Sequence, residues 1–361
     1  VAHQTDTYAA LSANVNSLEL LGITGIDLEL GGLINFNNTN RSDKERIDWT
    51  TATNLTNDPE SIFVDQDISS QTELQVLNGH GSLDIGPGNV VATIDDMTFT
   101  MAEMDVVTGN PSLGTISNAQ IVSLDIADAD FFAGVGAALN GSRNDIDTDD
   151  DTIGVLVEDA ELTINSVKTD TDSYTGLEAS ITSAQLLGIP AIDLQIGGNL
   201  GFNNTTGDHK IDWTTATDPA NNPDSLLTDL DVSESISLQI SDAEGSLVIG
   251  DNIQTDGSGN IGPGFVVALI DDTTLTMAEM DVVTGNPSLS TLNDATIVSL
   301  DIDTASFFAG TGAKLNSTRD TIITDDSIGV SVTGGFTLNN VKTDTDSYTG
   351  LEASITSAQL L

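Results

Sequence analysis

The stretch Val298-Ser-Leu300-Asp-Ile302-Asp-Thr-Ala305-Ser-Phe307 places apolar residues at every second position, with one interruption at Asp-Thr. A period of two is typical of a β-strand that buries one face. Comparable stretches surround Ile240, Ile270 and Val332, so the theme recurs at nearly even intervals along the chain. The sequence therefore predicts an all-β protein.

Short polar or small breaks divide these stretches, for example Asp271-Asp272 and Gly334-Gly335. Asp, Asn and Gly tolerate the backbone dihedrals of turns. In a β-solenoid each break would be a corner between stacked coils, whereas in tandem β-sandwich or meander modules each break would be a hairpin. We favour the solenoid, because the interval between stretches is a plausible coil length, and the sandwich or meander stays open as the alternative. Six coils spaced by about 4.8 Å would advance the chain by roughly 30 Å per unit.

A long repeat sets the domain organisation. The segment Val167–Leu187 recurs unchanged as Val341–Leu361, and a diverged copy opens the chain. We therefore divide the sequence into repeat unit 1 (residues 1–166), repeat unit 2 (167–340) and the start of repeat unit 3 (341–361). Head-to-tail repeats usually build elongated arrays in which each unit contacts its neighbours. Unit 2 gains residues around Asp251–Asn260, and we expect this insertion on a surface loop.

Composition excludes several classes of partner. The 56 Asp and Glu outnumber 9 Lys and Arg, which gives a formal net charge of −47. This balance argues against nucleic acid, which binds through cationic side chains, and against anionic lipid surfaces. No apolar run is long enough for a membrane span. High acidity favours bound cations or a salty exterior.

We expect no enzyme activity, because no candidate catalytic group recurs. The three His residues occupy positions that differ between the copies, and Cys is absent. Carboxylate pairs are plentiful, but a chain with 56 Asp and Glu contains such pairs by number alone, so they do not indicate a catalytic site. Trp49 and Trp213 do recur, within the shared sequence Ile-Asp-Trp-Thr-Thr-Ala-Thr. Such a Trp is either a sugar-stacking platform or, more commonly, part of a core or of a junction between units.

Acidic loops are the candidate metal sites. The segment Asn144–Asp151 places carboxylates at alternating positions, a spacing that suits a hard cation such as calcium. A plain solvated loop is the alternative. The candidate calcium ligands are Asp145, Asp147, Asp149, Asp150, Asp151, Asp325 and Asp326.

Four segments carry a family resemblance: Ile302–Gly310, Ile328–Val332, Leu186–Leu194 and Gly201–Thr206. In their order along the chain and in their general sequence character, these segments resemble repeat modules of giant bacterial surface proteins that are described as haemolysin-like or adhesin-like. The resemblance implies an extracellular location, calcium association and a role in adhesion or surface architecture.

The leading hypothesis for function is a structural segment of a giant extracellular repeat protein. It would form a rod or fibre whose partners are neighbouring repeats, other fibre copies or cell surfaces. The alternatives are a calcium-dependent glycan-binding module and a polysaccharide-degrading enzyme built on a solenoid. The enzyme is poorly supported, since aromatic residues make up only 4% of the chain and sugar-binding grooves depend on them.

Overall fold

The computed structural model describes residues 6–19, 26–41, 43–57, 59–60, 62–86, 88–149, 151–223, 225–251 and 253–361. The chain is nearly all β, which confirms the predicted fold class. The described residues contain two helices of four residues each, α1 (Trp49–Ala52) and α2 (Trp213–Ala216). The strands are β1 Tyr8–Glu19, β2 Ile26–Thr39, β3 Thr72–Ile85, β4 Val90–Val107, β5 Thr115–Val135, β6 Ala138–Leu139, β7 Ile146–Asp147, β8 Ile153–Lys168, β9 Ser173–Leu187, β10 Ile192–Thr205, β11 Ile236–Ile249, β12 Gln254–Thr255, β13 Ile261–Val282, β14 Leu292–Leu315, β15 Ile322–Ile323, β16 Ile328–Lys342 and β17 Ser347–Leu360.

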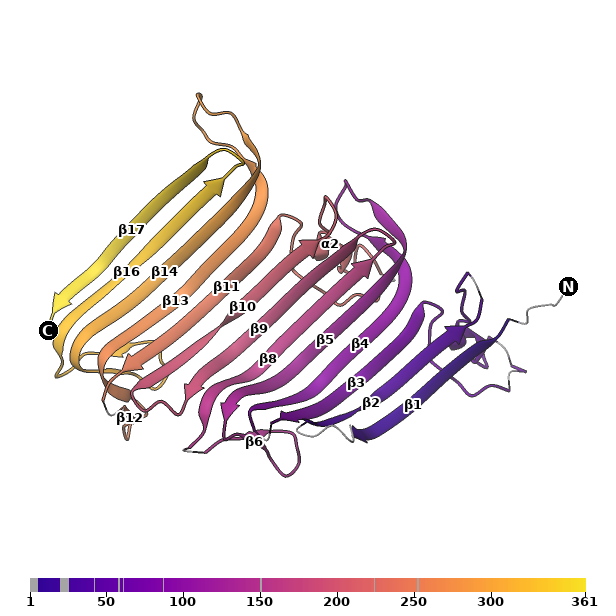
Figure 1. Cartoon of the computed structure of the whole chain (residues 1–361), viewed down its shortest axis with the longest axis horizontal. Helices are drawn as coiled ribbons and strands as arrows, with labels where there is room; N and C mark the ends of the chain where they lie inside the picture. The colour runs from indigo at the N-terminus through magenta and orange to yellow at the C-terminus, as the bar shows by residue number, and fades with distance from the viewer. Residues whose placement is uncertain are drawn as a thin grey trace.

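All the long strands belong to one open sheet. They lie in chain order from β1 to β17, while β12 and β15 pair with β13 and β14, and β6 and β7 form a separate pair (Figure 1). Each strand is antiparallel to its neighbours. Unit 1 supplies β1 to β5 and β8, unit 2 supplies β9 to β11, β13, β14 and β16, and β17 begins unit 3. This connectivity is a meander, so the expected solenoid of stacked coils is not confirmed.

The breaks in the apolar pattern are neither corners nor hairpins, which corrects both sequence-based interpretations of them. They lie inside continuous strands, where the pairing register shifts. Asp242 in β11 and Asp272 in β13 take positive φ values of 50° and 51°, and the registers shift between Ile240 and Ala243 and between Ile302 and Ala305. These are the features of β-bulges, which bend a strand without ending it.

True reversals occur elsewhere. The run Thr100–Leu113, which recurs as Thr276–Leu289, contains Gly109-Asn110-Pro111 and predicts a strand that ends in a tight turn. The structure confirms it: β4 ends at Val107, the Gly114 N–H donates to the Asn110 carbonyl, and β5 begins at Thr115. The inserted residues near Asp251–Asn260 lie outside the long strands, as expected for a surface loop. There Lys314 Nζ lies 2.9 Å from the Asp256 carboxylate and ties the loop to the end of β14. In the described part of the chain, no helix has the length and apolar character to cross a membrane.

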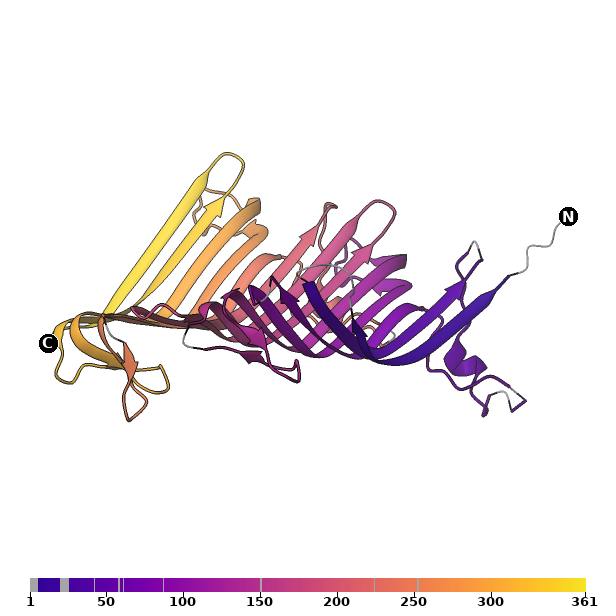
Figure 2. The same cartoon turned by 60° about the horizontal axis from the view of Figure 1, so that its bottom comes forward.

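The two faces of the sheet differ. Long connections pack against one face, here called the loop face, and Figure 2 shows α1 and the segment around β12 on the same side of the sheet. In the orientation of Figure 1, the upper loops are the described residues of 40–71 in unit 1 and of 206–235 in unit 2. The lower loops are the described residues of 136–152 and residues 316–327. Small apolar clusters lie beneath them, for example Phe132 with Ile146 and Phe308 with Leu315. The opposite face, here called the bare face, carries none of the described loops.

Candidate functional site

The predicted calcium loop forms a short hairpin and a turn. Asp147 pairs with Ala138 in the β6–β7 ladder. The Asp149 carboxylate accepts a hydrogen bond of 3.0 Å from the Asp151 backbone N–H and one of 3.2 Å from the Thr152 hydroxyl. Asp150 lies outside the described residues. In these contacts the Asp149 carboxylate stabilises the turn itself.

The remaining predicted ligands are also in turns. The Asp145 carboxylate accepts a 2.8 Å hydrogen bond from the Ile146 N–H. Asp325 and Asp326 lie in a turn closed by the Ser327 N–H and the Thr324 carbonyl, 3.1 Å apart. Calcium at these residues stays a prediction.

Among the described residues, one group of three acids has carboxylate oxygens within 4.8 Å of one another: Asp128, Asp130 and Asp159. Asp128 and Asp130 lie at the bulge of β5, and Asp159 lies on β8. Ladder pairing brings them together, since the Asp130 carboxylate accepts a 3.0 Å hydrogen bond from the Asp159 N–H. The cluster is largely exposed and its chemistry suits a metal ion, but nothing in it distinguishes calcium.

Crowding of acids near this cluster affects Glu158. Burial, followed by the negative charges of Asp130, Asp159 and Asp145, raises the pKa of Glu158 above its usual 4.5. A folded-state pKa above the unfolded value means that ionised Glu158 destabilises the fold. The penalty is present above the folded pKa and disappears below about 4.5.

We therefore expect Glu158→Gln to raise the urea midpoint of unfolding at pH 7 and to leave it unchanged at pH 4. The Glu158 carboxylate already accepts a hydrogen bond from Gln185 Nε2 at 3.2 Å, and an amide oxygen can keep it. Glu161→Gln on the same strand removes the same charge and serves as the control. A midpoint that falls at pH 7 would contradict this assignment.

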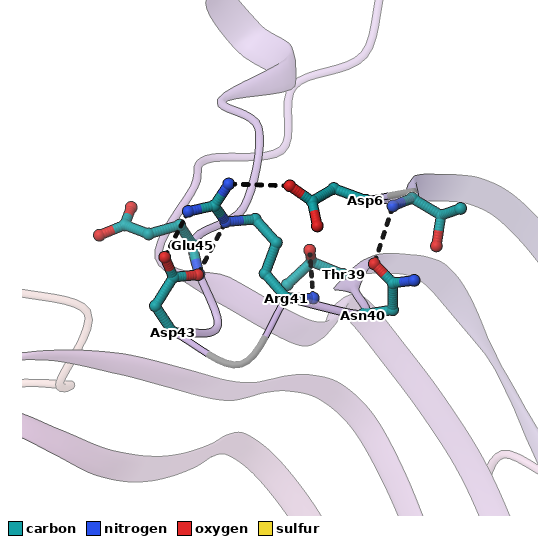
Figure 3. Close-up of polar contacts among 7 residues, drawn as sticks. Asp6, Thr39, Asn40, Arg41, Asp43 and Glu45 are labelled. Carbon is teal, nitrogen blue, oxygen red and sulfur yellow. Dashed lines mark hydrogen bonds and ion pairs between the residues drawn. The ribbon is translucent and has the colours of Figure 1, made fainter. Parts of the chain in front are cut away.

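Charge is also concentrated at the upper end of β1 and β2 (Figure 3). The Arg41 guanidinium bonds the Asp43 carboxylate and lies 3.1 Å from Asp6. This pairing lowers the pKa of Asp43 to about 2. Unit 2 has Gly207 at the position of Arg41, so the cluster is a local feature of unit 1 rather than a repeated site.

An Arg does recur in the lower loops, and sequence reasoning missed it. Arg143 Nε donates to Ser82 Oγ at 2.9 Å, and its Nη1 lies 2.8 Å from Asp27. Unit 2 repeats the arrangement with Arg319 at 2.9 Å from Ser246 Oγ and 2.6 Å from Asp193. Aligning the two copies shows both Arg residues in register, three positions after an Asn. Each Arg ties its lower loop to two strands of its own unit.

The junction between units 1 and 2 combines a buried Trp, an apolar cluster and hydrogen bonds. Trp213 begins α2 in the upper loop of unit 2, and it is fully buried. It belongs to an apolar cluster with Ile121 of β5, Val167 of β8 and Tyr174 of β9. The indole N–H donates to Asn203 Oδ1 at 3.0 Å. This burial fits the core or junction interpretation of the repeated Trp.

Hydrogen bonds lock the same upper loop onto unit 1. Asn165 Nδ2 on β8 donates to the Thr228 carbonyl at 2.6 Å, and the Thr228 hydroxyl lies 3.0 Å from Ser123 Oγ on β5. Asn110 Nδ2, in the β4–β5 turn, donates to the Lys210 carbonyl at 2.9 Å. The upper loop of unit 2 thus holds unit 1.

The strand pairing at the junction is repeated in register. Lys168 pairs with Ser173, and the ladder continues to Ala160 with Ile181. At the next boundary Lys342 pairs with Ser347, and the ladder continues to Gly334 with Ile355. β17 therefore begins unit 3 as β9 begins unit 2.

The two ends of the chain expose the two halves of this junction. Met104 is 5% exposed beneath the upper loop of unit 2, whereas its equivalent Met280 is 49% exposed. Val107 and Val283 show the same contrast, at 38% and 82%. At the other end Ile62 of the first upper loop is 93% exposed.

No protein-family model, curated protein or solved structure that was compared with this chain matches it.

Proposed function

We propose that this chain is a structural segment of an extracellular tandem-repeat array, in which successive units extend one antiparallel sheet into a rod. The proposal rests chiefly on the junction. Residues that the upper loop of unit 2 covers in unit 1 are exposed in unit 2, although the strands beneath them have the same sequence pattern. Met280 and Val283 are exposed toward one end of the sheet, and Ile62 is exposed at the other end. These two surfaces are suited to be the two sides of one repeated interface.

The physical basis of the rod is edge pairing. An antiparallel edge strand presents unpaired N–H and C=O groups that template the next strand. In the described structure β10 pairs with the far edge of β9, so an equivalent strand suits the far edge of β17. Six strands per unit at about 4.8 Å give an advance of roughly 29 Å per unit across the strands.

The setting of the rod is inferred from composition and resemblance. High acidity suits a surface exposed to a salty medium, and the resemblance to surface repeat modules supports an extracellular role in contact with other fibres or cells. No repeated catalytic group was found in the sequence, which favours architecture over catalysis.

Particle length tests the proposal. Inserting a second copy of residues 167–340 after Asn340 preserves the local sequence at both boundaries, because Val341–Leu361 repeats Val167–Leu187. Negative-stain electron microscopy of the two chains should show the longer one extended by roughly 29 Å across the strands with unchanged width. Particles that gain width equally in all directions would contradict a rod.

A further inference from the structure

The bare face carries an apolar row from β4 to β17, the last strand of the sheet. One ladder row runs through β4, β5, β8, β9, β10, β11, β13, β14, β16 and β17 and contains Met97, Ile126, Leu162, Ala179, Leu200, Ile240, Leu275, Leu300, Leu338 and Leu351. Residues paired across a ladder share a face of the sheet. Leu200 lies between Asn199 and Gly201, and Gly201 faces Val232 of the upper loop. The row is therefore on the side opposite the loops.

The loop face carries the charge. Successive side chains alternate between the faces, so Thr163 and its ladder partner Glu178 lie opposite the apolar row. Ladder pairing and the contacts of the lower-loop Arg residues place further acids on this side, including Glu29, Asp125, Asp130, Glu161, Glu178, Asp193, Asp301 and Glu352. Beside the apolar row the sheet thus places its acids on the loop side. Acids on the bare face lie away from that row, as Asp105 does between the loop-covered Met104 and Val106 at the upper end of β4. The apolar row needs a cover that keeps the acids in water.

The exposed area is large enough for a stable interface. The chain exposes 20037 Å², whereas a compact monomer of 37.5 kDa exposes about 14,000 Å². The surplus of about 6,000 Å² by that scaling belongs to the whole open sheet, its edges and loops included. It is several times the roughly 1,000–2,500 Å² that each subunit of an obligate dimer buries.

The bare face also has a depression and projecting side chains, which could fit the bare face of a second copy of the chain. At the line of bulges it has a depression of about 450 Å³ whose lining includes Ile196, Ile240 and Ile270. On the same face the rings of Phe131 and Phe307 are exposed. An interface around a two-fold axis needs projections and hollows on one surface, and this surface supplies both.

We infer that the bare face is an interface with a second copy of this chain, so that two sheets pack face to face and leave both acidic faces in solvent. The arrangement is a β-sandwich made of two chains, with aligned sheets about 10 Å apart. It buries the apolar rows without bringing the loop faces together, which keeps the like charges of the two chains on opposite sides. This inference is independent of whether units join end to end.

Sedimentation equilibrium of the unmodified chain at micromolar concentration gives the first test. The expected mass is twice the 37.5 kDa of one chain. A species of 37.5 kDa over the whole concentration range would overturn the inference. So would a single chain that purifies with extracted phospholipid, because lipid would then cover the bare face.

A matched pair of substitutions locates the interface. Leu275 and Thr274 are neighbours on β13 that point to opposite faces, with ladder partners Leu300 and Asp301. Leu275→Lys should convert the dimer to monomer, whereas Thr274→Lys should leave the mass unchanged. Loss of the dimer with Thr274→Lys alone would place the contact on the loop face and overturn the inference.

Cysteine labelling covers the case in which Leu275→Lys does not fold. The chain contains no Cys, so Leu275→Cys and Thr274→Cys each create one thiol with little change in volume or charge. Maleimide should react with the Leu275→Cys thiol slower by on the order of tenfold or more in the dimer, since labelling requires opening of the interface. Equal rates for the two thiols in a species of dimeric mass would contradict the face-to-face arrangement.

Discussion

Replacing Trp213 by Ala is expected to lower the free energy of unfolding by about 3–5 kcal/mol, the range for large aromatic residues in cores. The indole is fully buried at the junction, and its N–H bonds Asn203. Its loss leaves a cavity beneath the upper loop of unit 2 and an unpaired amide oxygen on Asn203. Guanidinium denaturation followed by circular dichroism measures the change.

Trp49→Ala is the matched control. Trp49 occupies the equivalent position in unit 1, and its indole N–H donates to Asn37 Oδ1 at 2.9 Å. The described residues place no strands of a preceding unit beneath this loop, so we expect a smaller loss of stability than with Trp213→Ala. Equal losses for the two variants would show that the Trp stabilises its own loop and not the junction.

Substituting Gly176 by Val should release the upper loop of unit 2 from the sheet. A Cβ at Gly176 would lie 2.6 Å from Trp213 Cε2 and Nε1, well inside van der Waals contact. Overpacking of this kind costs about 1–3 kcal/mol, and displacement of the loop also removes its bonds to Asn165 and Ser123. We expect a lower denaturation midpoint and rapid proteolysis within residues 206–235.

The repeat supplies a control for this prediction within the same sequence context. Gly350 corresponds to Gly176, and a Cβ there meets no atom within 4 Å. Gly350→Val should therefore be nearly neutral, because Val suits a strand better than Gly does. If both variants lose stability equally, the effect comes from the strand backbone and the proposed contact with Trp213 is wrong.

The strands were predictable because alternation acts locally. The spacing of Val298, Leu300 and Ile302 fixes which side chains share a face, and β14 contains all three. The meaning of the breaks was not predictable, since the same Asp and Gly residues suit corners, hairpins and bulges. Register with the neighbouring strand decides among them, and one strand's sequence does not contain that information.

The candidate sites show the same division. Asp145, Asp147 and Asp149 are close in sequence, and the loop uses the carboxylates of Asp145 and Asp149 for hydrogen bonds of its own. The acids that do meet come from two strands, so spacing along the chain gave no signal for them. The Arg143 and Arg319 contacts had a usable signal, since both Arg residues align when the two copies are superimposed.

Alternation also predicted one buried face for each strand, but it did not say what buries that face. In the structure Leu275 and its row partners lie on the side without loops. Covering that side requires a second layer, and strand periodicity carries no information about which molecule supplies it.

The antiparallel meander is most directly tested by pairs of introduced cysteines. The ladder places Asp301 beside Thr337, 36 residues apart, and Ser306 beside Thr333, 27 residues apart. Side chains of both pairs are hydrogen bonded, at 2.6 Å and 3.1 Å. Disulfides should form in Asp301→Cys/Thr337→Cys and in Ser306→Cys/Thr333→Cys alike, because sequence separation shrinks along an antiparallel ladder. In a solenoid with coils of constant length, neighbouring residues of adjacent coils would all be the same number of residues apart, so only one of the two disulfides could form. Failure of either crosslink in the folded chain would contradict the meander.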